Sequence, residues 1–407
     1  MNQLVKLLGV LFIISGCSTV DKVPFDTLVN TTSKSISYQA KTTYSLPSLN
    51  VFASNEFDGA RLNGFEKVND STATVIINPE NEPINHSAYY AFKVWSNTEK
   101  PFYLKFKYPA PHKHRYIPKL KKNDTWHIID SANVYREDSI VTIKVNLSKE
   151  PLFIAAQELE TYNEVKNWYT NLIKGKKDYV DLNYYGKTPK GKALPVLDIG
   201  KGSPEGKDVI VLLTRQHPPE VTGYYAFQHF LSTILDGSDL SKKFLKKYHV
   251  LAFPIMNPDG VDMGHWRHNS GGVDLNRDWS VYNQPEIKQT IKYITNTIKK
   301  NNSKIILGID FHSTFKDVFY TNEIRQGTTL PNFVTDWFNA LEKNIPNYQV
   351  NEAAGNSKKP VSKGWFLYGH NAVGITYEIG DATSKEKIEV VGEVTAQEMM
   401  KILNKSN

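Results

Sequence analysis

Cysteine is nearly absent from this sequence: Cys17 is the only one in 407 residues. A disulfide within the chain is therefore excluded, as is a zinc site built from cysteines. Long hydrophobic runs are lacking too, because the apolar stretch LLGVLFIISG near the N-terminus is too short to span a bilayer comfortably as a permanent helix. The lysines behind the formal charge of +7 are scattered, with no long basic block and no nucleic-acid-binding motif, so we expect no nucleic-acid partner.

The first twenty residues, MNQLVKLLGVLFIISGCSTV, have the organisation of a signal peptide, with Lys6 as the positive flank of a short apolar core. The core ends in Ile14-Ser15-Gly16-Cys17, which resembles the bacterial lipobox, where the cysteine after a small residue is lipidated. The resemblance implies a lipid anchor through Cys17 in the bacterial cell envelope. Ser18 after it is typical of sorting to the outer membrane, facing the periplasm. A simple signal peptide with a chance cysteine is the alternative.

The composition, 40% hydrophobic and 22% charged over 407 residues, indicates a globular protein of two domains. Residues 1–16 are assigned to the signal peptide, and residues 17–40, rich in Ser, Thr and Lys, to a tether. Residues 41–157 contain short alternating runs at 73–78, 88–95, 102–108, 125–130 and 141–147. In one of them, FYLKFKY, Phe102, Leu104 and Phe106 share one face, and this pattern predicts an all-β sandwich domain.

The periodicity becomes helical after Leu159, and strands and helices then alternate. Strands are expected over 209–213, 250–256, 305–311 and 374–379, and helices over 224–235 and 286–300. These strands are near-continuous apolar runs, as expected for a sheet that is covered on both faces. Residues 158–407 are therefore predicted to be an α/β domain with a mixed, mostly buried sheet and helices on both faces.

The stretch TRQHPPEVTG directly after the first of these strands places His217 three residues before Glu220. Pro218 and Pro219 stiffen the loop and suit the first turn of a helix, so both side chains can point at one ion. Catalytic zinc takes imidazole and carboxylate ligands and keeps one position open for water. His312 after the strand IILGIDF is a candidate third ligand, because ligands bind at the carboxyl ends of strands in open α/β sheets; alone, it is better explained as a core histidine.

Two further segments carry charged groups suited to substrate chemistry. NPDGVDMGHWRHNSGGVDLNRDW (257–279) contains Arg267 and the pair Asn276-Arg277. Arginine binds carboxylates with two parallel hydrogen bonds and can stabilise a developing oxyanion. Glu378 lies inside the apolar strand GITYEIG, where a carboxylate must be paired, directed at a metal or shifted in pKa. A general base fits that position.

Together these segments closely resemble the M14 zinc carboxypeptidases over residues 180–382. The order is the family's: HxxE, NPDG, an Arg before the NR pair, a lone His after a strand, and a Glu on a late strand. The β-sandwich with its stretch FDGARLNGFEKVND is similar to that of the cytosolic-carboxypeptidase-like branch. The resemblance implies one Zn²⁺ per chain, held by His217, Glu220 and His312, although cobalt or manganese could bind the same ligands.

The resemblance also implies roles for the other residues. Glu378 would activate the zinc-bound water and pass its proton to the leaving amine, and Arg267 would polarise the scissile carbonyl. Asn276 and Arg277 would hold the free C-terminal carboxylate, so a metallocarboxypeptidase acting on peptide or protein C-termini is expected. Lys363 lies near the position where the family sets the floor of its side-chain pocket. A lysine there would favour an acidic C-terminal residue; a loop lysine without such a role is an equal alternative.

Some features depart from the family or leave other functions open. Pro219 stands where the branch usually has Gly, and Tyr368 is too close to Glu378 in sequence to be the mobile tyrosine of the digestive enzymes. The predicted location would suit trimming of peptidoglycan stem peptides, which no residue favours. Deacylation of N-acyl amino acids is disfavoured by the full-length segment from NPDG to NRDW and by the β domain. A non-catalytic peptide-binding lipoprotein is disfavoured by the complete set of ligands and base. No pattern specifies an oligomeric state.

Overall fold

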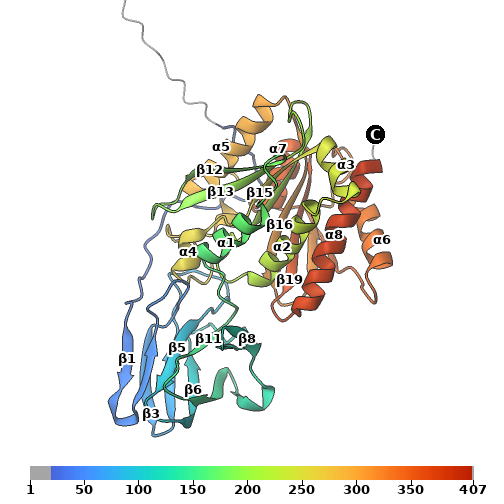
Figure 1. Ribbon diagram of the computed structural model, residues 1–407. Coiled ribbons are helices and arrows are strands. Elements are labelled where there is room, and N and C mark those ends of the chain that lie inside the picture. The colour runs from blue at the N-terminus through green and yellow to red at the C-terminus, as the bar shows by residue number, and fades with distance from the viewer. Residues whose placement is uncertain (1–19, 406–407) are drawn as a thin grey trace, which may run out of the picture.

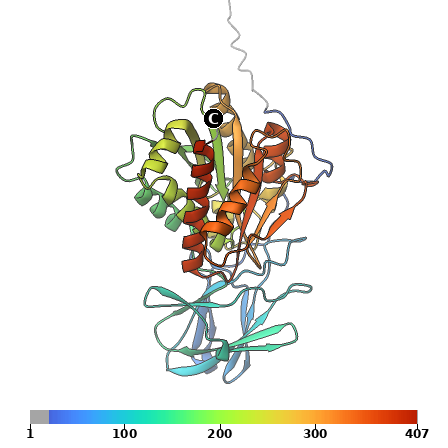
Figure 2. The ribbon, with the colours of Figure 1, turned by 90° about the vertical axis from the view of Figure 1, so that its right-hand side faces the viewer.

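The computed structural model describes residues 20–405. The expected signal peptide and Cys17 lie outside the described residues. The chain forms a β domain and a larger α/β domain, which lies above it in Figures 1 and 2. None of the helices in the described part of the chain is both long and apolar enough to cross a membrane.

The β domain consists of two sheets whose inner faces form one apolar core. The six-stranded sheet has the order β1 (Thr43–Leu46), β2 (Val51–Ser54), β5 (Ala91–Ser96), β11 (Leu152–Ala155), β7 (Lys119–Lys122) and β8 (Thr125–Ile128). The five-stranded sheet has the order β3 (Gly64–Asn69), β4 (Thr72–Ile76), β6 (Lys100–Lys107), β10 (Ile140–Leu147) and β9 (Val134–Glu137). Phe102, Leu104 and Phe106 of β6 are buried between the sheets, which confirms the predicted sandwich.

The α/β domain is built on one eight-stranded mixed sheet. Its order is β12 (Val180–Lys187), β13 (Ala193–Ile199), β15 (Tyr248–Phe253), β14 (Asp208–Thr214), β16 (Ile305–Thr314), β19 (Val373–Gly380), β17 (Val318–Thr321) and β18 (Glu352–Ala354). The central strands β15, β14, β16 and β19 are parallel, whereas β13 and β17 pair with them in antiparallel fashion. The central strands are almost entirely buried, which explains their continuous apolar sequences.

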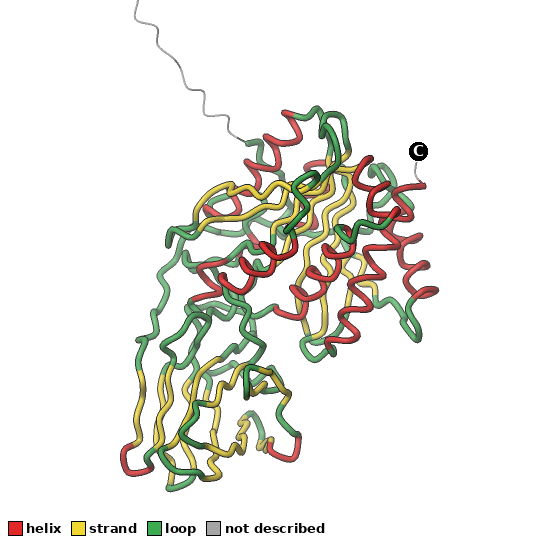
Figure 3. Tube along the Cα trace, viewed as in Figure 1, coloured by secondary structure: helices red, strands yellow, loops and turns green. Residues whose placement is uncertain are grey.

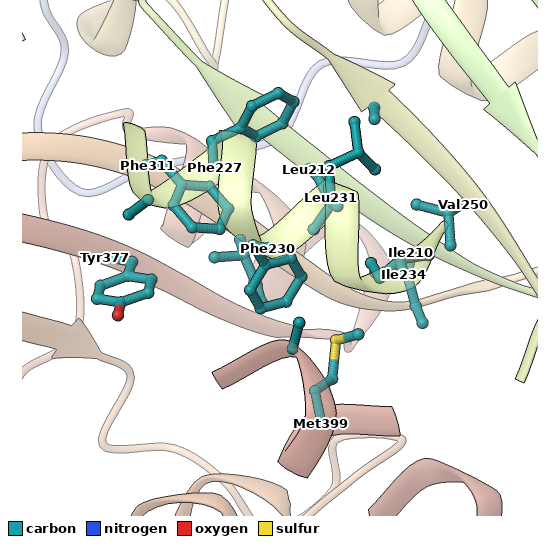
Figure 4. Close-up of a cluster of buried hydrophobic side chains, with 14 of the residues drawn as sticks. Ile210, Leu212, Phe227, Phe230, Leu231, Ile234, Val250, Phe311, Tyr377 and Met399 are labelled. Atoms are coloured by element: carbon teal, nitrogen blue, oxygen red, sulfur yellow. The ribbon is translucent and has the colours of Figure 1, made fainter. Parts of the chain in front are cut away.

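Helices cover both faces of this sheet, as predicted (Figure 3). One face carries α1 (Tyr162–Leu172), α2 (Val221–Ile234), α3 (Asp239–Lys247), α6 (Phe333–Asn344) and α8 (Lys385–Lys405). The other carries α5 (Pro285–Lys300) and α7 (Ser362–His370). In Figure 4, Phe230 of α2 lies between Phe311 of the sheet and Met399 of α8, and Phe227 also packs against Phe311. Each such buried side chain stabilises the fold by about 1.5–3 kcal/mol.

Residues 20–40 have no helix or strand, but they pack on the α/β domain, so the prediction of a tether is wrong for this part of the chain. Val23 is buried in the apolar cluster that includes α7. Thr31 is fully buried; its Oγ1 donates to Oδ1 of Asp278 over 2.5 Å, and its carbonyl oxygen accepts from Nε2 of Gln284 over 2.6 Å. A segment this polar cannot form a hydrophobic core of its own, but it can still pack along the surface of another domain.

Candidate active site

A cleft of about 650 Å³ opens at the carboxyl ends of the central strands, where the two domains meet. The residues around it include every site residue that the sequence predicts within the α/β domain: His217, Glu220, Arg267, Asn276, Arg277, His312, Lys363 and Glu378. These residues lie on five separate parts of the sequence, so the fold brings together what the motifs only suggested. Residues 84–87 and Arg115 of the β domain complete the wall.

His217, Glu220 and His312 converge at the bottom of this cleft. Nδ1 of His217 lies 2.8 Å from Oε1 of Glu220, and Nδ1 of His312 lies 2.6 Å from Oε2 of the same carboxylate. The two Nδ1 atoms are 3.2 Å apart, and all three side chains are buried. Two imidazole nitrogens and one carboxylate facing one point, with a cleft on the open side, are the donor set of a catalytic zinc site. The residues present therefore fit one zinc ion.

The outer ring nitrogen of each histidine faces a carboxylate that the sequence interpretation missed. Nε2 of His217 lies 2.9 Å from Oδ1 of Asp274, and Nε2 of His312 lies 2.8 Å from Oδ2 of Asp310. A ring that donates its Nε2 proton to a carboxylate keeps Nδ1 as the lone pair for a metal, and it is held in orientation. Asp310 was detectable as the single acidic residue in the apolar strand before His312. The spacing of Asp274 gave no such signal.

A close contact between α2 and β16 sets the spacing of the metal ligands. A Cβ atom on Gly223 would lie 2.1 Å from the carbonyl oxygen of His312, so only glycine allows the helix to approach the strand this closely. The backbone N–H of Gly223 also donates to Oγ of Ser313 over 2.8 Å. Because Glu220 directly precedes α2, this contact brings its carboxylate to His312.

The NPDG motif supports the metal-binding loop rather than the chemistry. Asn257 caps the short helix α4 (Pro258–Asp262), its Oδ1 accepting from the N–H of Gly260 over 3.0 Å. Its Nδ2 donates to the carbonyl of Gln216 over 3.1 Å, and its N–H donates to the carbonyl of Arg215 over 3.1 Å. The residues directly before His217 are thereby held in place, including Arg215 with its strained φ of +58°.

Glu378 lies half-buried in the wall of the cleft on β19, and its register partner on β16 is His312. Its Oε2 is buried and has no hydrogen-bond partner among residues 20–405. Burial raises the pKa of Glu378 to about 7, and the negative charge of Glu220 acts in the same direction. A carboxyl group with a pKa near neutrality and a free oxygen can both accept and return a proton.

The predicted substrate-binding residues surround the metal ligands. Nε of Arg267 donates to Oδ2 of Asp274 over 2.7 Å, and its Nη1 lies 3.9 Å from Oε1 of Glu220. Arg277, the more exposed arginine, follows Asn276 in the 3₁₀ turn η3 (Leu275–Arg277). Oδ1 of Asn276 accepts from the backbone N–H of Ser362 over 2.9 Å, which orients its amide. One arginine is thus held beside the metal ligands and the other further out.

Lys363 is a buried residue of α7, so its description as a loop lysine is wrong. Its Nζ donates to the carbonyl oxygens of Thr321 and Gly355 over 2.8 and 2.5 Å. Burial lowers the pKa of Lys363 to about 8. Tyr368, to which no catalytic role was assigned, packs against Phe25 and is not part of the cleft wall.

Arg115 and Tyr320 were not recognised from the sequence. Arg115 crosses from the β domain, and its Nε donates to Oδ2 of Asp381 over 2.8 Å while Nη1 donates to Oγ of Ser87 over 3.1 Å. Tyr320 on β17 lines the cleft with its side chain partly exposed. Their proximity to the site comes from packing between distant segments, which neither spacing nor periodicity reports.

The model of the zinc carboxypeptidase family, peptidase family M14, matches residues 165–397, which is more than half of the chain. The chain belongs to the M14 zinc carboxypeptidases, a family of metallocarboxypeptidase hydrolases. Cytosolic carboxypeptidase 6 of Caenorhabditis elegans is 24% identical over 211 residues, which are 50% of this chain and 43% of that protein. An uncharacterised protein of Zymomonas mobilis, ZMO1242, is 26% identical over 219 residues, 50% of this chain and 54% of that one. The chain thus spans about half the length of these curated relatives.

Solved structures share the fold over both domains. The metallo-carboxypeptidase of Burkholderia cenocepacia superposes with a TM-score of 0.72 at 15% identity, covering 87% of this chain and 98% of that one. The metallo-carboxypeptidase of Pseudomonas aeruginosa, solved in complex with (2-guanidinoethylmercapto)succinic acid, gives 0.68 at 14% identity, covering 86% and 98%. A β-sandwich followed by a zinc carboxypeptidase domain is therefore the shared architecture, as the sequence predicted.

Proposed function

We propose that the protein is an active zinc metallocarboxypeptidase that removes the C-terminal residue from peptides or proteins. One observation carries this proposal: the His217–Glu220–His312 cluster, the unpartnered carboxylate oxygen of Glu378 and two arginines all line a single cleft. A non-catalytic binding protein would not need a base of raised pKa beside a complete set of metal ligands.

The proposed division of labour follows from the geometry. Zinc, when bound, supplies Lewis-acid activation of water and of the scissile carbonyl. Glu378 takes a proton from the attacking water and returns it to the leaving amine, which its pKa of about 7 allows in both directions. The guanidinium of Arg267, fixed by Asp274, offers positive charge to the oxygen that becomes negative.

Exopeptidase action rests on Arg277 and Asn276. Arg277 is partly exposed at the cleft, and its Nη1 is held by the carbonyl of Asn276 over 2.7 Å, which leaves other donors of its guanidinium for a carboxylate. A free C-terminal carboxylate is the peptide group that such a pair would recognise. Internal peptide bonds and amidated C-termini lack it.

The finer proposal is a preference for acidic C-terminal residues. Lys363 lines the same cleft, and within residues 20–405 it forms no ion pair within 4.0 Å, although the carboxylate of Glu323 is near enough to oppose the lowering of its pKa by burial. An ammonium group has three donors, and two of them are directed at the carbonyls of Thr321 and Gly355. The third is available to the carboxylate of a substrate Asp or Glu side chain, and the buried surroundings strengthen that charge pairing.

We also propose that Cys17 carries the lipid anchor that its sequence context implies, which would place the enzyme at the bacterial outer membrane facing the periplasm. The N-terminal sequence motif supports this location. Labelling of cells with a fatty acid, compared between the wild type and Cys17→Ser, tests it. Label retained by the variant would overturn the proposal.

The function is tested with the zinc-loaded chain from Ser18 onward and peptides bearing each C-terminal residue, as free acids and as amides. Mass spectrometry should show that single residues are lost from free acids far faster than from amides. Muropeptides belong in the same assay, since cleavage of these alone would favour trimming of peptidoglycan stem peptides. If a chain that demonstrably holds zinc cleaves none of these peptides, the proposal is wrong.

A further inference from the structure

The loop that carries Arg267 is embedded in the β domain, although it belongs to the α/β domain by sequence. Trp266 is fully buried and is part of the apolar core of the sandwich. The centroid of its ring lies 6.3 Å from that of Tyr108 and 5.1 Å from that of His112. The residue next to Arg267 is therefore held by the other domain.

Glu80 of the β domain binds the backbone of the same loop. Its Oε2 accepts from the N–H of Trp266 over 2.8 Å, and its Oε1 accepts from the N–H groups of Arg267 and His268 over 3.0 and 2.7 Å. Glu80 is fully buried and forms no ion pair within 4.0 Å in the described part of the chain. Burial would raise the pKa of Glu80, but the guanidinium of Arg61, the nearby imidazoles of His265 and His268 and the backbone N–H of His268 hold it below its ordinary value. The carboxylate is thus charged and fully used on this loop.

The start of the loop is fixed by the β domain as well. Nε of Arg61 donates to the carbonyl of Gly264 over 2.7 Å, and Nη2 donates to that of Met263 over 3.3 Å. Gly264 has a φ of +63°, and a Cβ atom there would lie 2.3 Å from the carbonyl oxygen of Ala60. The β domain therefore holds this loop at two places: at Met263 and Gly264, just before Arg267, and at Arg267 itself.

From these contacts we infer that Glu80 is a positioning residue for Arg267, through which the β domain assembles the active site. Arg267 is held at two points: its backbone N–H by Glu80 and its Nε by Asp274. Both are needed to aim the guanidinium into the cleft, because a long side chain with only one fixed end can leave its reactive orientation. The inference rests on the proposed function, and it assigns the β domain a part in turnover.

Glu80→Gln tests the inference. Glutamine has the same size, but its side-chain NH₂ group is a donor and would face at least one of the backbone N–H groups that now donate to the carboxylate. We expect kcat to fall about 10- to 100-fold, the effect of a displacement of about 1 Å near the reacting atoms. KM for a free-acid peptide should change by less than about threefold and the zinc content should stay at one per chain, because Glu80 contacts neither ligand nor substrate. Glu66→Gln, the same change at an exposed position of the β domain, should have no effect.

A second variant and a double-mutant cycle separate positioning from general stability. Glu80→Asp keeps the charge on a shorter side chain and should restore part of kcat, even if Glu80→Gln folds poorly. In the Arg267→Ala background, Glu80→Gln should lower kcat less than twofold further, because the group it positions is gone. Equal losses in both backgrounds, or an unchanged kcat in Glu80→Asp and Glu80→Gln, would overturn the inference. A wild-type chain that cleaves no peptide would instead refute the proposed function.

Discussion

Glu378 and His312 are register partners on the neighbouring parallel strands β19 and β16. The proposed base and one metal ligand are therefore fixed relative to each other by the hydrogen bonds of the sheet. The remaining ligands come from a loop and a helix start that a single glycine contact holds against β16. Strands β16 and β19 and the start of α2 position two of the three ligands and the base, whereas His217 and the two arginines lie in loops or turns.

Gly223→Ala should damage the metal site without touching a ligand. Its Cβ would overlap the carbonyl oxygen of His312, so α2 and Glu220 must move away. We expect a loss of about 1–3 kcal/mol in stability and a weaker affinity for zinc. Thermal unfolding and competition with a chelator measure both. Gly200→Ala is the matched control, because the nearest atom to its Cβ is 3.7 Å away; equal behaviour of the two variants would contradict the proposed contact.

Asp274→Asn should affect both metal binding and turnover, because the two oxygens of Asp274 serve His217 and Arg267. Loss of a carboxylate behind a ligating histidine typically costs about 10–100-fold in metal affinity or activity. Zinc affinity and kcat, measured on the same preparation, check this. Asp178→Asn, an exposed position, should leave both at the wild-type level. If Asp274→Asn had the same zinc affinity and kcat as Asp178→Asn, Asp274 would have no supporting role.

Arg277→Ala should discriminate between substrates. If its guanidinium binds the C-terminal carboxylate, its removal costs about 2–5 kcal/mol on free-acid peptides. The slow background cleavage of amidated peptides should hardly change, since these offer no carboxylate. Comparing kcat/KM for matched acid and amide pairs tests the assignment. A loss of the same size on both would show that Arg277 does not select for the free C-terminus.

Any acidic preference should depend on pH through Lys363. Lysine is charged below its pKa and neutral above it, and burial lowers the pKa of Lys363 to about 8. The ratio of kcat/KM for C-terminal Glu over Leu should therefore be high near pH 6.5 and decline as the pH rises through 8. Lys363→Met should give a low, pH-independent ratio. A wild-type ratio that stays constant over this range would remove Lys363 from substrate selection.

The sequence was sufficient for the features that depend on nearby residues. Alternation in β6, the apolar runs of β14, β16 and β19, and the spacing of His217 and Glu220 are local patterns, and the structure contains each of them. Contacts between distant segments could not be foreseen in this way. Glu80 and the N–H of Arg267 are separated by 187 positions, and no periodicity links them.

The segment before β1 shows the same limit. Residues 20–40 have the composition of a solvated linker, and composition was the only available signal. The hydrogen bonds of Thr31, for example, go to Asp278 and Gln284, which lie 247 and 253 positions later in the chain. Burial of Thr31 depends on that partner surface and not on its own neighbours in sequence.

The most direct test of the account is Glu378→Gln, assayed with zinc bound on a free-acid peptide. Glutamine fills the same space in β19 but cannot take a proton from water. We predict that kcat falls by about 10²–10⁴-fold, while the zinc content remains one per chain because Glu378 is not a ligand. Turnover at the wild-type rate by a zinc-loaded Glu378→Gln protein would contradict the assignment of the base, and with it the proposed mechanism.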